Sequence, residues 1–309
     1  MPDESPIPLR RRLAGLARSI RPTADDLAWH PELPAGRMLA LPGRGSAFTR
    51  DNLRTGPQGD VPVLLLHGWT LSLDTTFFGL MPSLARRYPF AGFDQRGHGR
   101  TRLDARTFTV PDLAADAVAV LDELAIEKVV VCGFSLGGPV GLHLALAHPD
   151  RVAGLVLSAT ALTYTQSWRD RLFWSMIAAS AQLPRFGAAT SVAARYFGAN
   201  RRVPEFESRW PWLRHELARA PLSQHLATGR AVAGYDLRGR LGVLTGTPAA
   251  VVITTGDTVC PPRWQRQLAG QLGANTIPVP FDHDFPVAWP GTFGEVMLRA
   301  IDGIQAGLR

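Results

Sequence analysis

A serine between two glycines, at a strand-to-helix junction, is the pattern in this chain that most directly suggests chemistry. Residues 133–137 are Gly-Phe-Ser-Leu-Gly, and they follow the apolar run Val129–Val131 and precede a helix-like stretch. A sharp turn of this kind strains the backbone of the central serine and presents its hydroxyl at the sheet edge. Gly133 and Gly137 lack a Cβ, so the backbone can close there. The pattern predicts a nucleophilic Ser135.

A serine hydroxyl needs a base that removes its proton and an acid that orients this base. Asp257 follows the β-branched run 249–255, at a carboxyl end, where open α/β sheets place their ligands. His283 follows the shorter extended run 276–280 and is the only histidine after Asp257 in the chain. When the serine lies in such a turn, the acid and then the histidine follow it in the sequence. We therefore predict that Ser135, Asp257 and His283 form a catalytic triad.

Acyl transfer also needs two backbone N–H groups that stabilise a developing oxyanion. The residue after the nucleophile, Leu136, supplies one of them. We expect the second from Trp69, which follows the apolar run 61–66. Gly68 allows the backbone to approach the reacting atoms closely. His67 lies just before this glycine, and its position suits an ordering role in the loop better than a role as a base.

These motifs together resemble the α/β-hydrolase superfamily, in its serine-esterase-like and non-haem-haloperoxidase-like branch with a helical cap. The matching segments are His67–Trp69, Asp94–Arg100, Gly133–Gly138, Gly256–Asp257 and His283. The resemblance implies hydrolysis. His283 departs from the usual Gly-His pattern, because Asp282 and Asp284 flank it. A serine nucleophile argues against the haloalkane dehalogenase and epoxide hydrolase branches, whose chemistry uses a carboxylate.

Strands that alternate with helices predict an α/β fold with a mostly parallel sheet covered on both faces. We expect the α/β-hydrolase core in residues 36–160 and 241–309, and a helical cap in residues 161–240. The cap is rich in aromatic residues, which favours an apolar pocket over Ser135. Residues 1–35 form an N-terminal extension, in which leucines and arginines over 9–20 alternate at the spacing of an amphipathic helix.

The composition excludes several other classes of protein. The net charge is +7, but the basic residues are almost all scattered arginines, which does not indicate a nucleic-acid partner. Cys132 and Cys260 are the only cysteines, too few for a disulfide framework. No segment has the length and hydropathy of a membrane span, and the N-terminus lacks the apolar core of a signal peptide. A cytoplasmic location is the expectation.

The expected function is hydrolysis of carboxylic esters of small or medium hydrophobic substrates through an acyl-enzyme. The same triad could also cleave C–C bonds, open lactones or transfer acyl groups to alcohols. A receptor that keeps the triad and turns over slowly is the alternative outside enzymes. We expect no cofactor and no metal, because the Cys and His residues show no ligand spacing. The sequence leaves the oligomeric state open.

Overall fold

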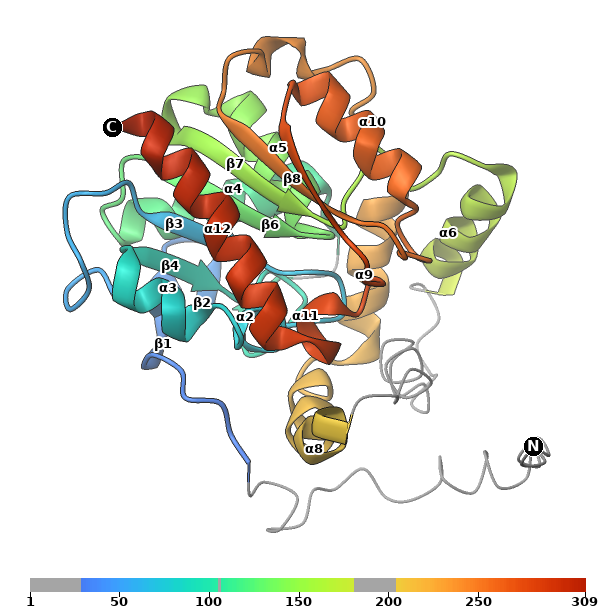
Figure 1. The fold of residues 1–309 in the computed structure, drawn as a ribbon. Coiled ribbons are helices and arrows are strands. Elements are labelled where there is room, and N and C mark those ends of the chain that lie inside the picture. Colours follow the sequence, from blue (N-terminus) through green and yellow to red (C-terminus); the bar gives the residue numbers. More distant parts are fainter. Residues whose placement is uncertain (1–28, 105–106, 181–203) are drawn as a thin grey trace, which may run out of the picture.

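A sheet of nine strands forms the centre of the structure (Figure 1). The computed structural model describes residues 29–104, 107–180 and 204–309. Neighbouring strands follow the order β1-β2-β4-β3-β6-β7-β8-β9, and the short β5 pairs with β2. The bounds of the strands are β1 Gly36–Leu41, β2 Gly45–Asp51, β3 Val63–Leu66, β4 Phe90–Phe93, β5 Arg102–Leu103, β6 Val129–Phe134, β7 Val152–Ser158, β8 Ala249–Thr254 and β9 Asn275–Val279.

Most of this sheet is parallel. Strands β4, β3, β6, β7, β8 and β9 run in one direction, whereas β2 is antiparallel to β1, β4 and β5. Strands β3, β6, β7 and β8 are buried along their whole length. A continuous apolar run is typical of a parallel strand that is covered on both faces. The expected fold class, a mostly parallel sheet between helices, is confirmed.

Alternate residues of the buried strands point to two separate cores. On β6, Val129 and Val131 belong to the core that also contains α4, α5 and α10. Val130 and Cys132 belong to the opposite core, with α3, α11 and α12. Figure 1 shows α12 crossing the face of the second core. The helices are α2 Leu73–Phe77, α3 Met81–Arg87, α4 Val110–Glu123, α5 Gly137–Ala147, α6 Trp168–Ser180, α8 Pro204–Leu217, α9 Leu222–Ala233, α10 Pro262–Leu272, α11 Phe285–Ala288 and α12 Pro290–Leu308.

Local signals set the ends of these helices. Helix α4 begins at Val110, because Thr109 and Asp112 form a capping box there. Pro111 then lies in the first turn, where its missing N–H is not needed. Helix α10 ends before Gly273, which adopts a left-handed conformation with φ of 61°. Glycine is favoured at such a position because it lacks a Cβ.

Helices α6, α8 and α9 lie between β7 and β8, and we call residues 159–248 the helical insertion. Trp212 of α8 packs edge-on against Trp29 and Phe78, with ring centroids 5.6 and 5.1 Å away. The amphipathic helix expected over residues 9–20 lies outside the described residues, as do the insertion aromatics Phe186, Tyr196 and Phe197. No helix in the described ranges has the length and apolar character needed to cross a membrane.

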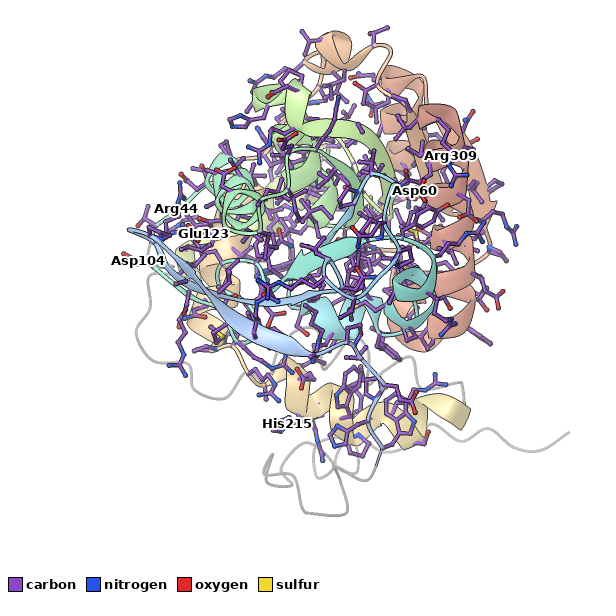
Figure 2. The ribbon with its side chains drawn as sticks, turned by 90° about the vertical axis from the view of Figure 1, so that its left-hand side faces the viewer. Arg44, Asp60, Asp104, Glu123, His215 and Arg309 are labelled. Carbon is purple, nitrogen blue, oxygen red and sulfur yellow. The ribbon has the colours of Figure 1, made fainter. Side chains whose placement is uncertain are left out.

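A hydrogen bond and an ion pair link the last helix, α12, to the loop that precedes β3. Gln305 of α12 donates a hydrogen bond from Nε2 to the carbonyl oxygen of Val61, at 2.6 Å. Figure 2 shows Arg309 beside Asp60, and their side chains form an ion pair at 3.0 Å. These contacts hold the start of β3, and the carboxyl end of the same strand leads directly into the loop at Gly68.

Candidate active site

Ser135 occupies a strained turn between β6 and α5. Its φ is 50°, a left-handed value that costs energy for a residue with a side chain. Gly133 and Gly137, on either side of Ser135, lie so close to backbone atoms that a side chain would not fit. A Cβ on Gly133 would lie 2.6 Å from the carbonyl oxygen of Gly137, and one on Gly137 would lie 1.9 Å from that of Leu66. The Ser135 N–H donates to the carbonyl oxygen of Ser158 at 2.9 Å, which ties the turn to β7.

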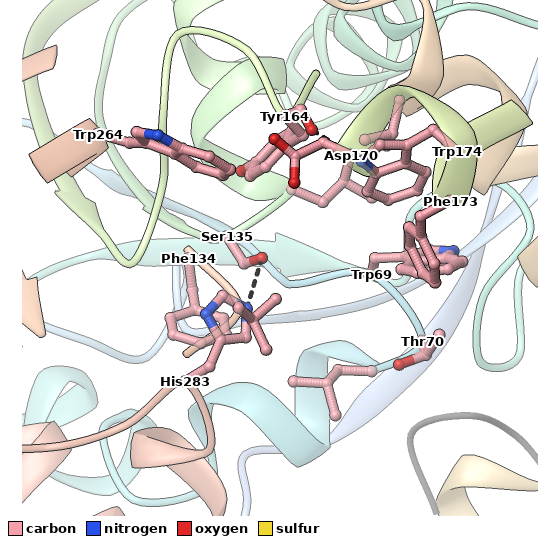
Figure 3. Close-up of a pocket in the computed structure, with 14 residues that line it drawn as sticks. Trp69, Thr70, Phe134, Ser135, Tyr164, Asp170, Phe173, Trp174, Trp264 and His283 are labelled. Atoms are coloured by element: carbon pink, nitrogen blue, oxygen red, sulfur yellow. Dashed lines mark hydrogen bonds between the residues drawn. The ribbon is translucent and has the colours of Figure 1, made fainter. Parts of the chain in front are cut away.

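His283 joins Ser135 to Asp257. Its Nε2 lies 3.0 Å from Ser135 Oγ, the contact drawn as a dashed line in Figure 3. Its Nδ1 lies 2.9 Å from Asp257 Oδ2. The three residues come from the turn after β6, the loop after β8 and the loop after β9. The structure therefore brings together the three side chains that the sequence selected.

Other groups orient the Asp257 carboxylate. Its Oδ1 accepts hydrogen bonds from the backbone N–H groups of Cys260 and Val259, at 2.6 and 2.9 Å. Its Oδ2 accepts one from the hydroxyl of Thr254 at 2.7 Å. The Gln265 amide bridges Thr254 Oγ1 and the carbonyl oxygen of Cys260. The carboxylate is thus held in one direction, with Oδ2 facing the imidazole of His283.

The two acids beside His283 in the sequence have other partners. The Oδ1 atom of Asp282 accepts hydrogen bonds from the backbone N–H groups of Thr258 and His283, at 2.8 and 2.7 Å. It therefore ties the loop after β8 to the loop after β9. Asp284 is buried and is the N-cap residue of α11. Asp257 is the carboxylate whose oxygen meets the imidazole ring.

Charge around His283 changes the affinity of its ring for a proton. Burial alone would lower the pKa, but the attraction and hydrogen bond of Asp257 outweigh it, with smaller contributions from Asp282 and Asp284. The net result is a pKa for His283 above its ordinary value of 6.5. A neutral imidazole is needed to accept a proton, so this shift sets the lower pH limit for His283 as a base.

The loop after β3 brings its backbone against Ser135. A Cβ on Gly68 would lie 2.9 Å from the ring of Phe134 and 3.4 Å from the Cβ of Ser135. Glycine therefore permits the close approach of the Gly68–Trp69 peptide. The Trp69 indole N–H donates to the carbonyl oxygen of His225 at 2.7 Å, which joins this loop to α9.

His67 bonds to backbone groups through both of its ring nitrogens. Its Nε2 accepts from the N–H of Gln95 at 2.8 Å, so Nδ1 carries the proton and donates to the carbonyl oxygen of Gly68 at 2.9 Å. Burial lowers the pKa of His67 to about 4. His98 accepts similarly from the N–H of Thr70 at 3.2 Å. The two histidines join the loop after β3 to the turn 94–100.

An apolar cavity of about 260 Å³ opens over Ser135 and His283 (Figure 3). Six of its fourteen lining residues are Phe, Trp or Tyr, and these come from both the core and the helical insertion. The complete lining is Trp69, Thr70, Leu71, Phe134, Ser135, Leu136, Tyr164, Asp170, Phe173, Trp174, Val232, Val259, Trp264 and His283. Trp168, by contrast, is 63% exposed and does not line the cavity.

Sequence reasoning did not assign a role at the site to Tyr164, Asp170 or Trp264. The Tyr164 hydroxyl bonds to Thr160 Oγ1 at 3.1 Å and also interacts with the Ser135 side chain. Burial raises the pKa of Tyr164, so its hydroxyl keeps its proton. Tyr164 comes shortly after the carboxyl end of β7, and this position is a signal that could have identified it.

The described residues contain no group of three or more His, Cys, Asp or Glu side chains placed to hold a metal ion. Cys132 and Cys260 are both buried and free. Burial raises the pKa of each thiol, so neither has the character of a reactive thiolate.

Comparison with known proteins places this geometry in a family. The family described as "alpha/beta hydrolase fold" matches residues 61–276. A putative carbamate hydrolase RutD from Caulobacter vibrioides is 28% identical over 267 residues, which cover 81% of this chain and 94% of that protein. The 3-oxoadipate enol-lactonase 2 of Acinetobacter baylyi is 28% identical over 219 residues, covering 67% of this chain and 76% of that one.

Solved structures show the same architecture. A hydrolase from Pseudomonas aeruginosa PA01 superposes with a TM-score of 0.73 at 25% identity, covering 86% of this chain and 98% of that chain. The esterase EaEST from Exiguobacterium antarcticum also has a TM-score of 0.73, at 21% identity, with 87% and 100% covered. The family match over residues 61–276 covers most of the chain and includes the segments that carry Ser135 and Asp257. The chain belongs to the alpha/beta hydrolase fold family.

Proposed function

We propose that this protein is a serine hydrolase that cleaves carboxylic esters of small or medium hydrophobic substrates. The observation that carries the proposal is the pair of hydrogen-bond contacts that joins Asp257 to His283 and His283 to Ser135, at the base of an apolar cavity. The names of similar proteins, which include an enol-lactonase, a carbamate hydrolase and esterases, support an acyl-type substrate. We also propose that residues 161–240 act as a cap over the site.

In the first half of the reaction, Ser135 Oγ attacks the ester carbonyl carbon. The proton of the hydroxyl passes to His283 Nε2, and Asp257 stabilises the imidazolium that forms. The tetrahedral intermediate then collapses, and His283 gives the proton to the departing alcohol. An acyl group remains on Ser135 Oγ.

Two backbone N–H groups stabilise the oxyanion, those of Leu136 and Trp69. Each such donor contributes on the order of 3 kcal/mol to transition-state stabilisation. The position of Gly68 against Ser135 supports this assignment, because the next peptide group is that of Trp69. Neither N–H donates a hydrogen bond to the residues that the structure describes, which leaves both available for a bound oxygen.

In the second half, water replaces the alcohol. His283 removes a proton from the water, which attacks the acyl carbon, and the acid product leaves as Ser135 recovers its proton from His283. The aromatic walls of the cavity favour an apolar acyl or alcohol group, because burial of apolar surface stabilises the complex. A lactone would react through the same steps, with the alcohol retained in the product.

A fluorophosphonate probe tests this function directly. An activated serine reacts rapidly with such a probe, and we expect stoichiometric labelling of the wild-type protein at Ser135, located by peptide mass spectrometry. The Ser135→Ala protein provides the control. An unlabelled wild-type protein that also leaves p-nitrophenyl esters of all chain lengths intact would instead be a ligand receptor.

A further inference from the structure

The cavity over Ser135 has an uneven distribution of charge. Among the described residues that line it, Asp170 is the one carboxylate and none is a lysine or an arginine. Figure 3 shows Asp170 on the opposite side of the cavity from Ser135, near Tyr164 and Trp174. Asp170 is half-buried at the rim of these apolar walls, so its carboxylate is accessible to a ligand as well as to solvent.

One oxygen of the Asp170 carboxylate accepts a hydrogen bond within the protein. Its Oδ2 accepts from the backbone N–H of Ser167 at 2.7 Å, and its own N–H donates to Ser167 Oγ at 3.2 Å. This is a capping box at the start of α6. No basic side chain in the described part of the chain pairs with Asp170. The cap therefore fixes the direction of the carboxylate, and among the described residues no basic side chain neutralises its charge.

Aromatic rings form a wall beside this carboxylate. The ring centroids of Trp69 and Trp174 are 5.2 Å apart, and those of Phe173 and Trp174 are also 5.2 Å apart. The Trp174 indole N–H donates to the carbonyl oxygen of Tyr164 at 3.0 Å, which fixes the orientation of the ring. The face of an aromatic ring is electron-rich, so such a wall attracts cations.

We propose that the cavity selects esters that carry a cationic group, either a quaternary ammonium or a protonated amine. The cation binds between Asp170 and the aromatic wall of Trp69 and Trp174, while the ester carbonyl lies at Ser135. This inference rests on the proposed ester hydrolysis and adds the class of substrate. The same charge distribution disfavours esters that carry a carboxylate or a phosphate.

A pair of esters that differ in one atom tests the proposal. Butyrylcholine and 3,3-dimethylbutyl butyrate have nearly the same shape, and a neutral carbon replaces the ammonium nitrogen in the second. We expect the wild-type protein to show a kcat/KM about tenfold higher for the choline ester, because the carboxylate of Asp170 attracts the ammonium group and the aromatic wall adds a smaller cation–π contribution. Asp170→Asn should remove most of this preference.

The ratio of the two rates separates charge recognition from helix capping. Asparagine can still accept the hydrogen bond from Ser167, and any remaining loss of cap or packing would lower both rates together. Asp150→Asn, which removes an exposed acid away from the cavity, is the matched control and should keep the wild-type ratio. Equal rates for the two esters in the wild-type protein, or a ratio unchanged by Asp170→Asn, would overturn the proposal.

A binding measurement covers the case in which neither ester is hydrolysed. That result would contradict the proposed function, and binding to the Ser135→Ala protein then decides the inference separately. Choline should quench the fluorescence of the cavity tryptophans at lower concentration than 3,3-dimethylbutanol does, and Asp170→Asn should remove this difference. Equal affinity for choline and the neutral alcohol would exclude a cation site.

Discussion

The Nε2 atom of His283 lies 3.0 Å from the Oγ atom of Ser135, although the two residues are 148 positions apart in the chain. Parallel strands explain this proximity, because β6, β8 and β9 all end at the same edge of the sheet. Each strand delivers one side chain to that edge, and the loops after β8 and β9 are joined by the Asp282 carboxylate.

Replacement of Ser135 by alanine removes the proposed nucleophile. We expect kcat for a simple p-nitrophenyl ester to fall by a factor on the order of 10⁴ or more. Steady-state kinetics gives this value, and circular dichroism shows whether the variant is folded. A folded variant with nearly wild-type turnover would exclude the serine mechanism.

Asp257→Asn should reduce kcat far more than Asp282→Asn. The first variant removes the negative charge next to the imidazole and favours the wrong tautomer of His283, which costs a factor of about 10⁴ in a triad. The second variant alters a loop contact and a smaller part of the charge around His283, and it provides the matched control. Parallel measurement with one ester decides the matter, and a larger loss in Asp282→Asn would mean that the acid is misassigned.

The pH profile should show a midpoint above 6.5 on its acid side. Protonated His283 cannot act as a base, and its pKa is raised by Asp257, so the active neutral form is lost as the pH falls through this raised value. The dependence of kcat/KM on pH reports the free enzyme, provided that the substrate does not ionise. A midpoint below 6.5 would contradict the electrostatic role of Asp257.

His67→Gln should make the protein less sensitive to acid. The pKa of His67 is about 4 in the folded protein and about 6.5 in the unfolded chain, so the unfolded chain binds more protons between these values. Stability from this group is therefore lost as the pH falls below 6.5, by about 1.4 kcal/mol per pH unit. Glutamine can accept the Gln95 N–H and does not titrate.

Urea denaturation at pH 7.0, 6.0 and 5.0 measures this difference between the two proteins. The free energy of unfolding of the wild type should fall relative to His67→Gln by about 2 kcal/mol between pH 7.0 and 5.0. A constant offset between the two proteins over this range would show that His67 is not held neutral in the fold.

The dependence of kcat/KM on the length of the acyl chain should show how large a substrate the cavity admits. Each methylene that fits gains about 0.8 kcal/mol, and one that exceeds the available space loses more. A series of p-nitrophenyl esters should therefore show an optimum in kcat/KM at short or medium acyl chains, followed by a steep fall. Rates that still rise with long chains, or activation at a lipid–water interface, would favour a lipase.

The fold could be predicted from the sequence for identifiable reasons, and local signals also selected the three side chains that the structure brings together. Strands β6, β7 and β8 are continuous apolar runs, and glycine pairs mark the turn at Ser135. The position of Asp257 after a buried strand distinguished it from Asp282. Such signals are local, so they can be recognised before the chain is folded.

The walls of the cavity could not be predicted in the same way. Asp170 and Trp174 reach the site because the helical insertion folds back over the sheet, and no local pattern encodes that packing. Trp264 lies on α10, outside the insertion, and contributes to the same cavity. The two-residue strand β5 was also not predicted, since its pairing with β2 depends on tertiary contacts.

The lack of a Cβ at Gly137 limits which substitutions this protein can accept during evolution. A Cβ on this residue would lie 1.9 Å from the carbonyl oxygen of Leu66, so no larger residue fits there and the turn that carries Ser135 tolerates little substitution. The cavity walls are not constrained in this way. Substitutions in these walls, for example on α6, where Asp170 and Trp174 lie, can therefore change selectivity while the reacting centre is inherited unaltered.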